Sequence, residues 1–511
     1  MNEDNSYNLV DEPWIPVLMR DGTNSSVSLG GIFADTQGAL ADLALNPYER
    51  VAVFRLLLCI AQAATEMKSE RDWFSARESV GPAAAKYLAK WKDRFFLFGK
   101  SAFLQVDCLA PGGTIPDTSR LVIHSSHHFG SPLFSHEIDT RGETPLSPPI
   151  LALSLLTYLN FSASGGTPTC IWKGSATRQV GAAASPCRSQ SKLFTFIMGE
   201  SLLGTVWMNL LTDNQLRELN IKKGRPCWEF PFDDCTSVEN NAENWLGPVD
   251  KTSRRATEPT LLGVLAPLSR FIKLKHEERS CLICEGFSFP TWRDPSATYY
   301  GRAQRNGTTE IVPLRVNAKR LPWRDLSSIL ELGTEKGGAI ALEHLATLST
   351  RMASDHPFSI WTGGVYSDAD RDKDMFAGEW RFTRQMSALR KETLSDYQGA
   401  VDWATRQWFC KGRQHQPDIG LKPATCQYAT ALLVDDASRF SAPAERIYWD
   451  ILAQPANQRL VQNVGSDTYM DDWKDAAFKA AEEAYRRACP AMNARQMEAF
   501  AQGFAKLRVP G

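Results

Sequence analysis

Hydrophobic residues recur at three- and four-residue spacing from Pro47 onward, a pattern that predicts an α-helix. One face of this helix carries Val51, Phe54, Leu57, Leu58 and Ala61. Apolar residues at 53, 56 and 60 fill much of the other side, so we expect this helix to be buried nearly all round. A second apolar helix is expected at residues 150–160.

Short strands are expected between breaker residues elsewhere in the first three quarters of the chain. Residues 8–17 have the pattern of an extended entry segment, a polar turn follows at 21–26, and Val27–Leu29 is expected to be a paired strand. The region 264–333 is predicted to be β-rich, with strands at Leu265–Leu274, Ala297–Arg302 and Ile311–Val316. The dipeptide Asn306-Gly307 predicts a hairpin turn between the last two strands.

After about Arg384 the pattern is helical to the end of the sequence. The last helix is expected to bury a stripe formed by Met497, Phe500, Ala501, Phe504 and Leu507. The helix before it is expected to bury Trp473, Ala476, Ala477, Ala480 and Ala484. Such stripes on consecutive helices joined by short polar connections predict an antiparallel bundle. Since 511 residues are too many for one ordinary core, we predict more than one domain. The helices and short strands together predict an α+β protein. It has a large mixed domain of helices and short antiparallel sheets at 1–383 and a helical bundle at 384–511.

Two long loops flank the helix expected at 150–160. Residues 110–149 contain many prolines and glycines and few helical signals, which is typical of a functional or disordered loop. The second loop runs from Ser162 through Gly165-Gly166 to Pro186. No acidic residue lies between Ser162 and Lys192, whereas four basic ones do, counting the last: Lys173, Arg178, Arg188 and Lys192.

The charge balance limits the kind of nucleic-acid binding that the chain can support. Its 57 basic residues nearly cancel its 58 acidic ones, which argues against a free-standing histone-like binder. Local basic patches, or membership of a larger basic assembly, remain compatible with this balance. The first residues are polar and acidic, unlike a signal peptide, and no apolar run approaches the length of a membrane span. We therefore expect a cytoplasmic protein whose 11 cysteines are reduced thiols, most of them packed in the core.

Enzyme motifs are mostly missing from the sequence. Gly99-Lys100-Ser101 lacks the earlier glycine that a phosphate-binding loop needs, and neither His-Glu-x-x-His nor Gly-x-Ser-x-Gly occurs. Four histidines in one loop could hold a metal, but exposed polar side chains explain them more simply: His124, His127, His128 and His136. We therefore expect a protein that is not an enzyme.

Two further segments resemble metal sites in part. Cys281 and Cys284 form half of a structural zinc site, which His276 or Cys187 would have to complete. The simpler interpretation is a reduced pair of buried thiols, so no cofactor is expected. The acidic segment 368–374 imitates a calcium-binding loop, but Lys373 stands where that loop needs glycine, and a solvated acidic turn is expected instead.

Three basic stretches are candidates for contact with a nucleic-acid backbone. They are Lys222-Lys223-x-Arg225, Arg302 with Arg305, and Lys319-Arg320 with Arg324. Arg302 and Arg305 lie in or beside the predicted hairpin, where they could straddle a phosphate backbone. Charge on a hairpin also serves simple solvation, so these stretches do not establish the function by themselves.

Taken in order, several segments resemble the CasA family, the large subunit of the type I-E CRISPR Cascade complex. The opening Asn-Leu-Val-Asp-Glu-Pro-Trp-Ile-Pro-Val of residues 8–17 is similar to the opening of that family. Further along, the resemblance rests on the helix near 51–64, the tripeptide at 103–105, the glycine loop, segments 194–200 and 207–211, the Cys-x-x-Cys, Pro322-Trp323, Gly363-Gly364 and residues 444–446. The resemblance covers nearly the whole chain.

The resemblance implies a non-catalytic subunit that inspects double-stranded target DNA for the protospacer-adjacent motif. Its implied partners are the other Cascade subunits, the 5′ handle of the CRISPR RNA, the target duplex and a helicase-nuclease effector. The RNA then reads the sequence by base pairing. A wedge hairpin would begin strand separation.

Carried over to this sequence, Gly165 and Gly166 match the loop that approaches the minor groove, beside the basic Lys173. Arg302, Arg305, Lys319 and Arg320 are the candidate contacts to the DNA backbone. Phe129 or Phe134 would be the aromatic residue near the RNA handle. The implied wedge follows a turn at Gly363-Gly364 and comprises Ser367, Asp368, Ala369 and Asp370.

The sequence departs from the family at three places. Aspartates stand where the wedge usually carries a glutamine, no clear groove-reading lysine follows the Cys-x-x-Cys, and residues 146–149 lack a second Cys-x-x-Cys. Two other functions therefore stay open. One is a free-standing metal-dependent nuclease or hydrolase that uses Asp368, Asp370, Asp372 and the loop histidines. The other is a scaffold that binds only proteins.

Overall fold

The computed structural model forms two compact units. The first comprises Met1–Ala318, Glu331–Arg351 and Phe358–Glu379, and the second comprises Lys319–Leu330, Met352–Pro357 and Trp380–Gly511. The structure describes residues 6–123, 146–177, 182–188, 191–231, 234–250, 253–275, 279–290, 292–304, 309–317, 322–330, 337–352, 358–368, 371–382, 391–412 and 418–507.

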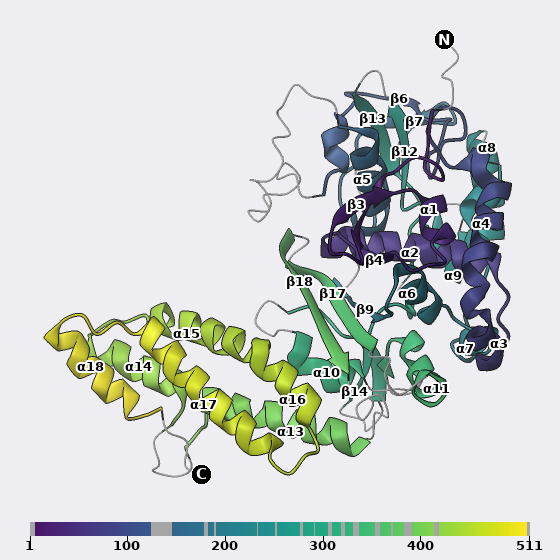
Figure 1. Ribbon diagram of the computed structural model, residues 1–511. Coiled ribbons are helices and arrows are strands. Elements are labelled where there is room, and N and C mark those ends of the chain that lie inside the picture. Colours follow the sequence, from purple (N-terminus) through teal and green to yellow (C-terminus); the bar gives the residue numbers. More distant parts are fainter. Residues whose placement is uncertain are drawn as a thin grey trace. The chain divides into compact units, whose positions relative to one another are not determined.

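The first unit is built from helices and small antiparallel sheets (Figure 1). Its helices are α1 (Leu29–Ala34), α2 (Pro47–Ala64), α3 (Glu70–Ser75), α4 (Val80–Trp91), α5 (Pro148–Phe161), α6 (Leu202–Met208), α7 (Asp213–Glu218), α8 (Cys235–Leu246), α9 (Leu261–Leu265) and α11 (His344–Arg351). Its strands up to β9 are β1 (Ser6–Asn8), β2 (Ile15–Met19), β3 (Asn24–Val27), β4 (Leu40–Leu43), β5 (Phe96–Phe98), β6 (Ala110–Pro111), β7 (Cys170–Trp172), β8 (Ser175–Ala176) and β9 (Leu193–Met198). The remaining strands are β10 (Val249–Asp250), β11 (Arg255–Ala256), β12 (Arg270–Lys275), β13 (Ser280–Glu285), β14 (Tyr299–Ala303), β15 (Thr309–Pro313), β16 (Gly337–Gly338), β17 (Phe358–Asp368) and β18 (Arg371–Phe382).

Helix α2 is the central element of this unit. Asn46 caps it by accepting a hydrogen bond from the Glu49 backbone N–H, and Pro47 occupies its first turn, where no backbone donor is needed. The helix is buried on all sides, as its apolar pattern predicts, and it packs against α4, α5, α6 and α9. Burial of this kind supplies most of the hydrophobic stabilisation of a core helix.

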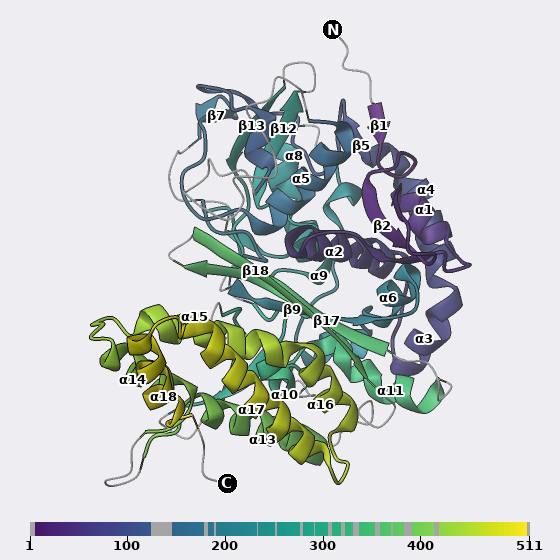
Figure 2. The same cartoon turned by 60° about the vertical axis from the view of Figure 1, so that its left-hand side comes forward.

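Three strands form the sheet nearest to α2, in the order β18-β17-β9 (Figure 2). Strand β17 pairs antiparallel with β9 from Ser359 opposite Met198 to Gly364 opposite Leu193. Gly363 and Gly364 therefore lie inside a strand, and the predicted turn at this dipeptide is wrong. A Cβ at position 363 would lie 2.2 Å from the Trp361 ring, so the side chain of Trp361 fills the space that glycine leaves.

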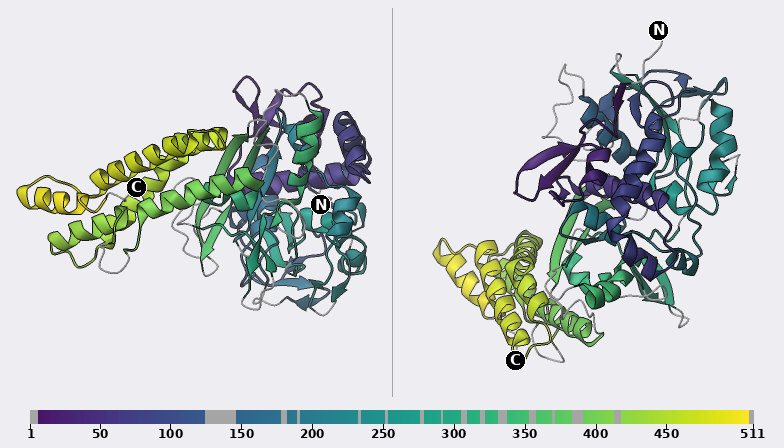
Figure 3. Two further views of the ribbon diagram at one scale, coloured as in Figure 1. Left: turned by 90° about the horizontal axis from the view of Figure 1, so that it is seen from below. Right: turned by 45° about the vertical axis from the view of Figure 1, so that its right-hand side comes forward.

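The second unit is a helical bundle, as its apolar stripes predict (Figure 3). Its helices are α10 (Leu326–Ile329), α13 (Lys391–Trp408), α14 (Leu421–Ala431), α15 (Ser438–Ile451), α16 (Asn457–Asn463), α17 (Tyr469–Ala488) and α18 (Ala494–Phe504). Trp323 precedes α10, and its carbonyl accepts a hydrogen bond from the Tyr397 hydroxyl at 2.8 Å. Trp323 also packs against Trp449 of α15 and Trp473 of α17, so ring contacts and the Tyr397 hydrogen bond together join this segment to three helices of the bundle.

The α+β class is confirmed, as are the two apolar helices and the hairpin of β14 and β15. Three element predictions need correction. The expected strand Val27–Leu29 ends at Val27, because Ser28 caps α1 through its side-chain oxygen. Leu265 belongs to helix α9, and strand β12 begins only at Arg270. In α18, Met497 and Ala501 face solvent, and the buried residues are Ala499 and Gly503.

Candidate nucleic-acid interface

The glycine loop begins at a buried stem, formed by Ser162 and Ser185, that is held by hydrogen bonds. The Gly165 backbone N–H donates to the Ala182 carbonyl at 2.9 Å, and this bridge closes the loop. Gly165 has a φ of 127°, a conformation that favours glycine. It is half-buried, whereas Gly166 is exposed. The two predicted glycines are thus neighbours at the point where the chain leaves the core.

Hydroxyl groups and one guanidinium hold the stem of this loop in place. The Ser162 and Ser185 hydroxyl oxygens lie 2.5 Å apart, and Ser185 lies 2.7 Å from the Ser269 hydroxyl. Arg270, which is buried, donates to the Ala163 carbonyl at 2.6 Å. Since these polar groups are buried and satisfied, they fix the stem more firmly than an ordinary surface turn. Desolvation lowers the pKa of Arg270 from its usual value.

Lys173 lies in the turn between β7 and β8, and its charge is already paired. Its ammonium is 2.5 Å from a carboxylate oxygen of Glu239 on α8. The other carboxylate oxygen of Glu239 accepts from the Trp172 indole N–H at 2.9 Å. Desolvation acts to raise the pKa of Glu239, but the hydrogen bonds from Lys173 and Trp172 outweigh it, so this pKa is lowered. Glu239 is therefore ionised at neutral pH.

Two of the other basic residues in the segment 162–192 do not face solvent. Arg188 is buried, and so is Lys192, whose ammonium donates to the Pro186 carbonyl at 3.2 Å. Burial lowers the pKa of Lys192 from its usual value. Arg178 lies outside the described residues. In the part of this segment that the structure describes, Lys173 is thus the only exposed cation.

Strands β14 and β15 form the predicted hairpin, and Arg302 is an exposed residue of β14. Its guanidinium is 2.7 Å from the Glu310 carboxylate on β15, which also accepts from the Gln304 amide at 3.0 Å. The charge of Arg302 is therefore already paired with a carboxylate of the same hairpin. Arg305, Lys319 and Arg320 lie outside the described residues.

The basic stretch Lys222-Lys223-x-Arg225 is also engaged within the first unit. Lys222 lies 3.6 Å from Glu258, and Arg225 lies 2.5 Å from Glu229. Lys223 donates to the Thr65 carbonyl at 2.7 Å. These contacts explain the three cations as parts of the local surface, without need of a nucleic-acid partner.

The hairpin of β17 and β18 contains the residues expected in the wedge. Ser367 and Asp368 are the last residues of β17, while Ala369 and Asp370 lie outside the described residues, as do Phe129 and Phe134 and the four loop histidines. Gly363 and Gly364 lie further down β17 in its pairing with β9. The structure therefore separates the two glycines from the tip of this hairpin.

Cys281 and Cys284 lie in strand β13, not in a metal-binding turn. Positions three apart on a strand face opposite sides of the sheet, so the two thiols do not converge. Cys284 hydrogen-bonds to Cys170 on β7, an interaction that raises the pKa of Cys284 and lowers that of Cys170. Burial raises the pKa of Cys281 to about 12. Among the described residues, no three Cys, His, Asp or Glu side chains form a metal-binding group.

The expectation that the cysteines are reduced is wrong for one pair. Cys108 and Cys235 form a disulfide across a sequence separation of 127 residues. The remaining nine are free, and seven of these are buried, as the sequence predicts. Nothing in the local spacing identifies the bonded pair, because the fold brings Cys108 to the first residue of α8.

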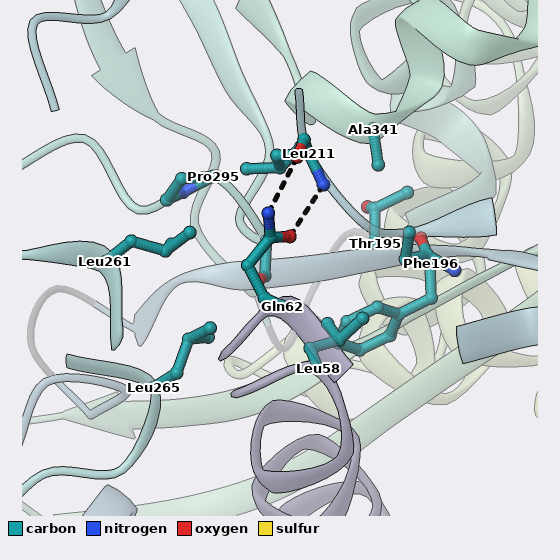
Figure 4. A pocket seen from close by; sticks show the side chains of 11 residues that line it. Leu58, Gln62, Thr195, Phe196, Leu211, Leu261, Leu265, Pro295 and Ala341 are labelled. Carbon is teal, nitrogen blue, oxygen red and sulfur yellow. Dashed lines mark hydrogen bonds between the residues drawn. The ribbon is translucent and has the colours of Figure 1, made fainter. Parts of the chain in front are cut away.

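A small cavity inside the first unit offers little room for a substrate (Figure 4). Its volume is about 20 Å³, which suits a single water molecule. Gln62 points into it, donating to the Leu211 carbonyl at 2.8 Å and accepting from the Leu211 N–H at 2.9 Å. Leu58, Leu261 and Leu265 line the apolar side. This cavity therefore has the character of a core packing defect and not of a catalytic pocket.

Motif analysis missed Glu239, Trp172 and Arg254. Glu239 is 66 residues beyond Lys173 in the sequence, and an isolated glutamate on a polar helix has no distinguishing pattern. Only the contact of α8 with the β7–β8 hairpin reveals it.

No helix among the described residues has the length and apolar character of a membrane span.

Comparisons with known proteins agree with this architecture. The family described as CRISPR-associated protein Cse1 matches residues 8–489. The CRISPR-associated protein CasA/Cse1 of Thermus thermophilus is 24% identical over 537 residues, covering 97% of this chain and 95% of that protein.

Solved structures share the fold across nearly the whole chain. Thermobifida fusca Cse1 has a TM-score of 0.75 at 19% identity, with 98% of each chain covered. Thermus thermophilus CasA has a TM-score of 0.73 at 23% identity, also with 98% of each covered. A chain of a CRISPR RNA-guided surveillance complex has a TM-score of 0.68 at 16% identity, with 99% of this chain and 100% of that one covered. The match to the family over most of the sequence shows that this chain belongs to the CRISPR-associated Cse1 (CasA) family.

Proposed function

We propose that the chain is a non-catalytic subunit of a CRISPR RNA-guided surveillance complex that recognises the protospacer-adjacent motif in double-stranded DNA. Family membership supports this proposal, and a similar fold occurs in a chain of such a complex. The other subunits of the complex, the 5′ handle of the CRISPR RNA and a helicase-nuclease are its further partners, in the cytoplasm. The hairpin of β17 and β18 would help to begin strand separation.

The observation that carries the proposal is the glycine pair, half-buried Gly165 and exposed Gly166, at the end of its buried stem. A minor groove is only about 6 Å wide, so a loop that enters it must present backbone with little side chain. Gly165 and Gly166 meet this requirement, and the buried stem of Ser162, Ser185 and Arg270 fixes their direction. A stem that is fixed before binding also avoids part of the entropy cost of ordering on binding.

A scaffold that binds only proteins is the second candidate. The ion pairs of Lys173 with Glu239 and of Arg302 with Glu310 favour it, because they reduce the positive charge available to DNA. The ligands expected for a metal-dependent nuclease include Asp370 and the four loop histidines, which lie outside the described residues, so no observation favours that alternative. The scaffold and the proposed function differ in whether duplex binding depends on the glycine loop.

The test adds the purified chain to a surveillance complex that lacks this subunit. Electrophoretic mobility of a duplex pool, randomised beside the target, measures binding and motif preference. We expect Gly165→Asp to abolish motif-dependent binding, because the carboxylate would meet phosphates and the new Cβ would strain the backbone at a φ of 127°.

Gly22→Asp is the matched control. Gly22 also has a positive φ, of 85°, nothing lies within 4 Å of the position that an added Cβ would take, and it lies outside the glycine loop. We expect this variant to bind DNA like the natural protein. Motif-independent binding by the natural protein, or equal losses in both variants, would contradict the proposal.

A further inference from the structure

Glu239 is the point on which three donors converge. The Lys173 ammonium lies 2.5 Å from one of its oxygens, and the Trp172 indole N–H donates to the other at 2.9 Å. The Arg254 Nε lies 4.0 Å from the same oxygen as the indole. Two cations and one neutral donor around one carboxylate form an anion-binding site, and the occupant is a side chain of the same protein.

Two of the donors are fixed by packing before any anion binds. The Trp172 ring stacks on Phe271 with centroids 4.6 Å apart and an interplanar angle of 16°. The Arg254 guanidinium lies over the Trp172 ring, 4.8 Å from its centroid, and donates to the Glu285 carbonyl at 3.1 Å. Trp172 is buried, so its N–H direction is set by the core. The site therefore keeps its shape when its occupant changes.

The third donor, Lys173, reaches into solvent. It stands in the tight turn between β7 and β8, where Lys173 and Gly174 both have positive φ, of 51° and 77°. Its side chain is 39% exposed and that of Glu239 is 28% exposed, so water and ions reach their contact. An ion pair this open stabilises only weakly and can be exchanged for another anion.

The charge available beside the glycine loop depends on this pair. Lys173 is the exposed cation of the described part of segment 162–192, since Arg188 and Lys192 are buried. While Glu239 holds Lys173, the β7–β8 turn presents little net positive charge. A phosphodiester offers two unesterified oxygens, as a carboxylate does, and can accept from the same donors.

We propose that Glu239 occupies a site for a backbone phosphate of the target duplex, and that the phosphate displaces it by rotation of the Glu239 side chain. This inference rests on the proposed function. Displacement adds the cost of separating Lys173 from Glu239 to every binding event. That cost weakens sequence-independent binding, so that duplexes lacking the recognised motif are released more readily.

The test measures duplex affinity of the reconstituted complex with Glu239→Gln. Glutamine keeps the size of the side chain and can still accept from Trp172, but it does not neutralise Lys173. We expect affinity to rise about fivefold at low salt, the effect of releasing one weak ion pair. Glu258→Gln is the matched control, because it removes one negative charge from a surface pair, with Lys222, in the same unit.

A double-mutant cycle then assigns the gain to Lys173. We expect Lys173→Ala to lower affinity in the natural protein, because it removes a phosphate donor and leaves the Glu239 charge unpaired, and to remove the gain in the Glu239→Gln background. Glu239→Asp keeps the charge but shortens the side chain, so it should give a smaller gain in duplex affinity. It replaces Glu239→Gln in the test if that variant lowers the thermal midpoint of unfolding. A gain that Glu258→Gln reproduces, or one that survives Lys173→Ala, overturns the inference.

Two further outcomes separate the inference from the proposed function. The same variants are compared for binding of the guide RNA during assembly, and a change confined to RNA binding would overturn the duplex assignment. If the natural protein supports no duplex binding in the complex, the proposed function itself fails. Motif-dependent binding that Glu239→Gln leaves at the level of the control overturns only this inference.

Discussion

Arg55 and Asp294 form an ion pair in the core of the first unit, with Nη1 and Oδ2 2.6 Å apart and neither side chain exposed. Arg55 also donates to the Asn160 side chain at 3.2 Å and to the Val264 carbonyl at 2.8 Å. One guanidinium on α2 thus joins α5, α9 and the segment that precedes β14.

Asp294→Asn should destabilise the first unit by about 3–5 kcal/mol, because it leaves a buried guanidinium without its counter-charge. Urea unfolding followed by tryptophan fluorescence measures the loss. Asp450→Asn is the control, since Asp450 pairs with Arg446 at 3.8 Å in an exposed position. We expect that variant to lose at most about 1 kcal/mol. Similar losses in the two variants would show that the buried pair contributes no more than a surface pair.

Glu70 should make the stability of the first unit depend on pH. Its carboxylate lies 2.8 Å from Nδ1 of the buried His344, whose Nε2 contacts the Leu210 carbonyl at 2.8 Å. Desolvation acts to raise the pKa of Glu70, but the hydrogen bond and charge of His344 outweigh it and lower this pKa below the ordinary 4.5. A depressed pKa adds stability above the ordinary value, and this stability is lost as the pH falls through the folded value.

Glu70→Gln should therefore cost about 1 kcal/mol at pH 7, a small loss because the Glu70 side chain is 38% exposed. The difference between the variant and the natural protein should shrink below pH 4.5. Thermal midpoints at a series of pH values measure it. Glu258→Gln provides the comparison at an exposed pair. A difference that stays constant down to about pH 3, well below the ordinary pKa of a glutamate, would refute the coupling.

Gly363→Ala should destabilise the sheet of β9, β17 and β18 by about 1–3 kcal/mol, because its Cβ would meet the Trp361 ring at 2.2 Å. Gly399→Ala is the matched change in α13, where nothing lies within 4 Å of the added Cβ. Alanine favours a helix, so this variant should gain up to about 1 kcal/mol. Opposite shifts of the thermal midpoint are expected, and shifts of the same sign would contradict the packing explanation.

Loss of the Cys108–Cys235 disulfide should lower the stability of the first unit by about 2–4 kcal/mol, because the bond closes a long loop in the unfolded chain. Thermal unfolding of Cys235→Ser, and of the natural protein with a reductant, measures the effect. Cys426→Ser, at a free and partly exposed thiol, is the control. An unchanged midpoint of the natural protein after reduction would contradict the expected contribution.

Local patterns predicted the elements whose residues interact with near neighbours in sequence. The apolar period of α2, the stripe of α17 and the hairpin of β14 and β15 are of this kind. Family membership also followed from the sequence, because many short segments occur in the same order as in the family, although each segment by itself is only a weak match. Gly165 and Gly166 were found by this route, and the structure places them at the surface end of a buried stem.

The tertiary structure alone decided which partner each functional side chain has. In the sequence, Lys173 is a cation in a segment without acidic residues. Folding brings a carboxylate oxygen of Glu239, on α8, to 2.5 Å from the Lys173 ammonium. Gly363-Gly364 reads as a turn, but pairing with β9 makes it part of a strand, and strand β13 likewise turns Cys281 and Cys284 to opposite faces. Helical periods are set by contacts three or four residues apart, whereas strand pairing and ion pairing depend on residues brought together only by the completed fold.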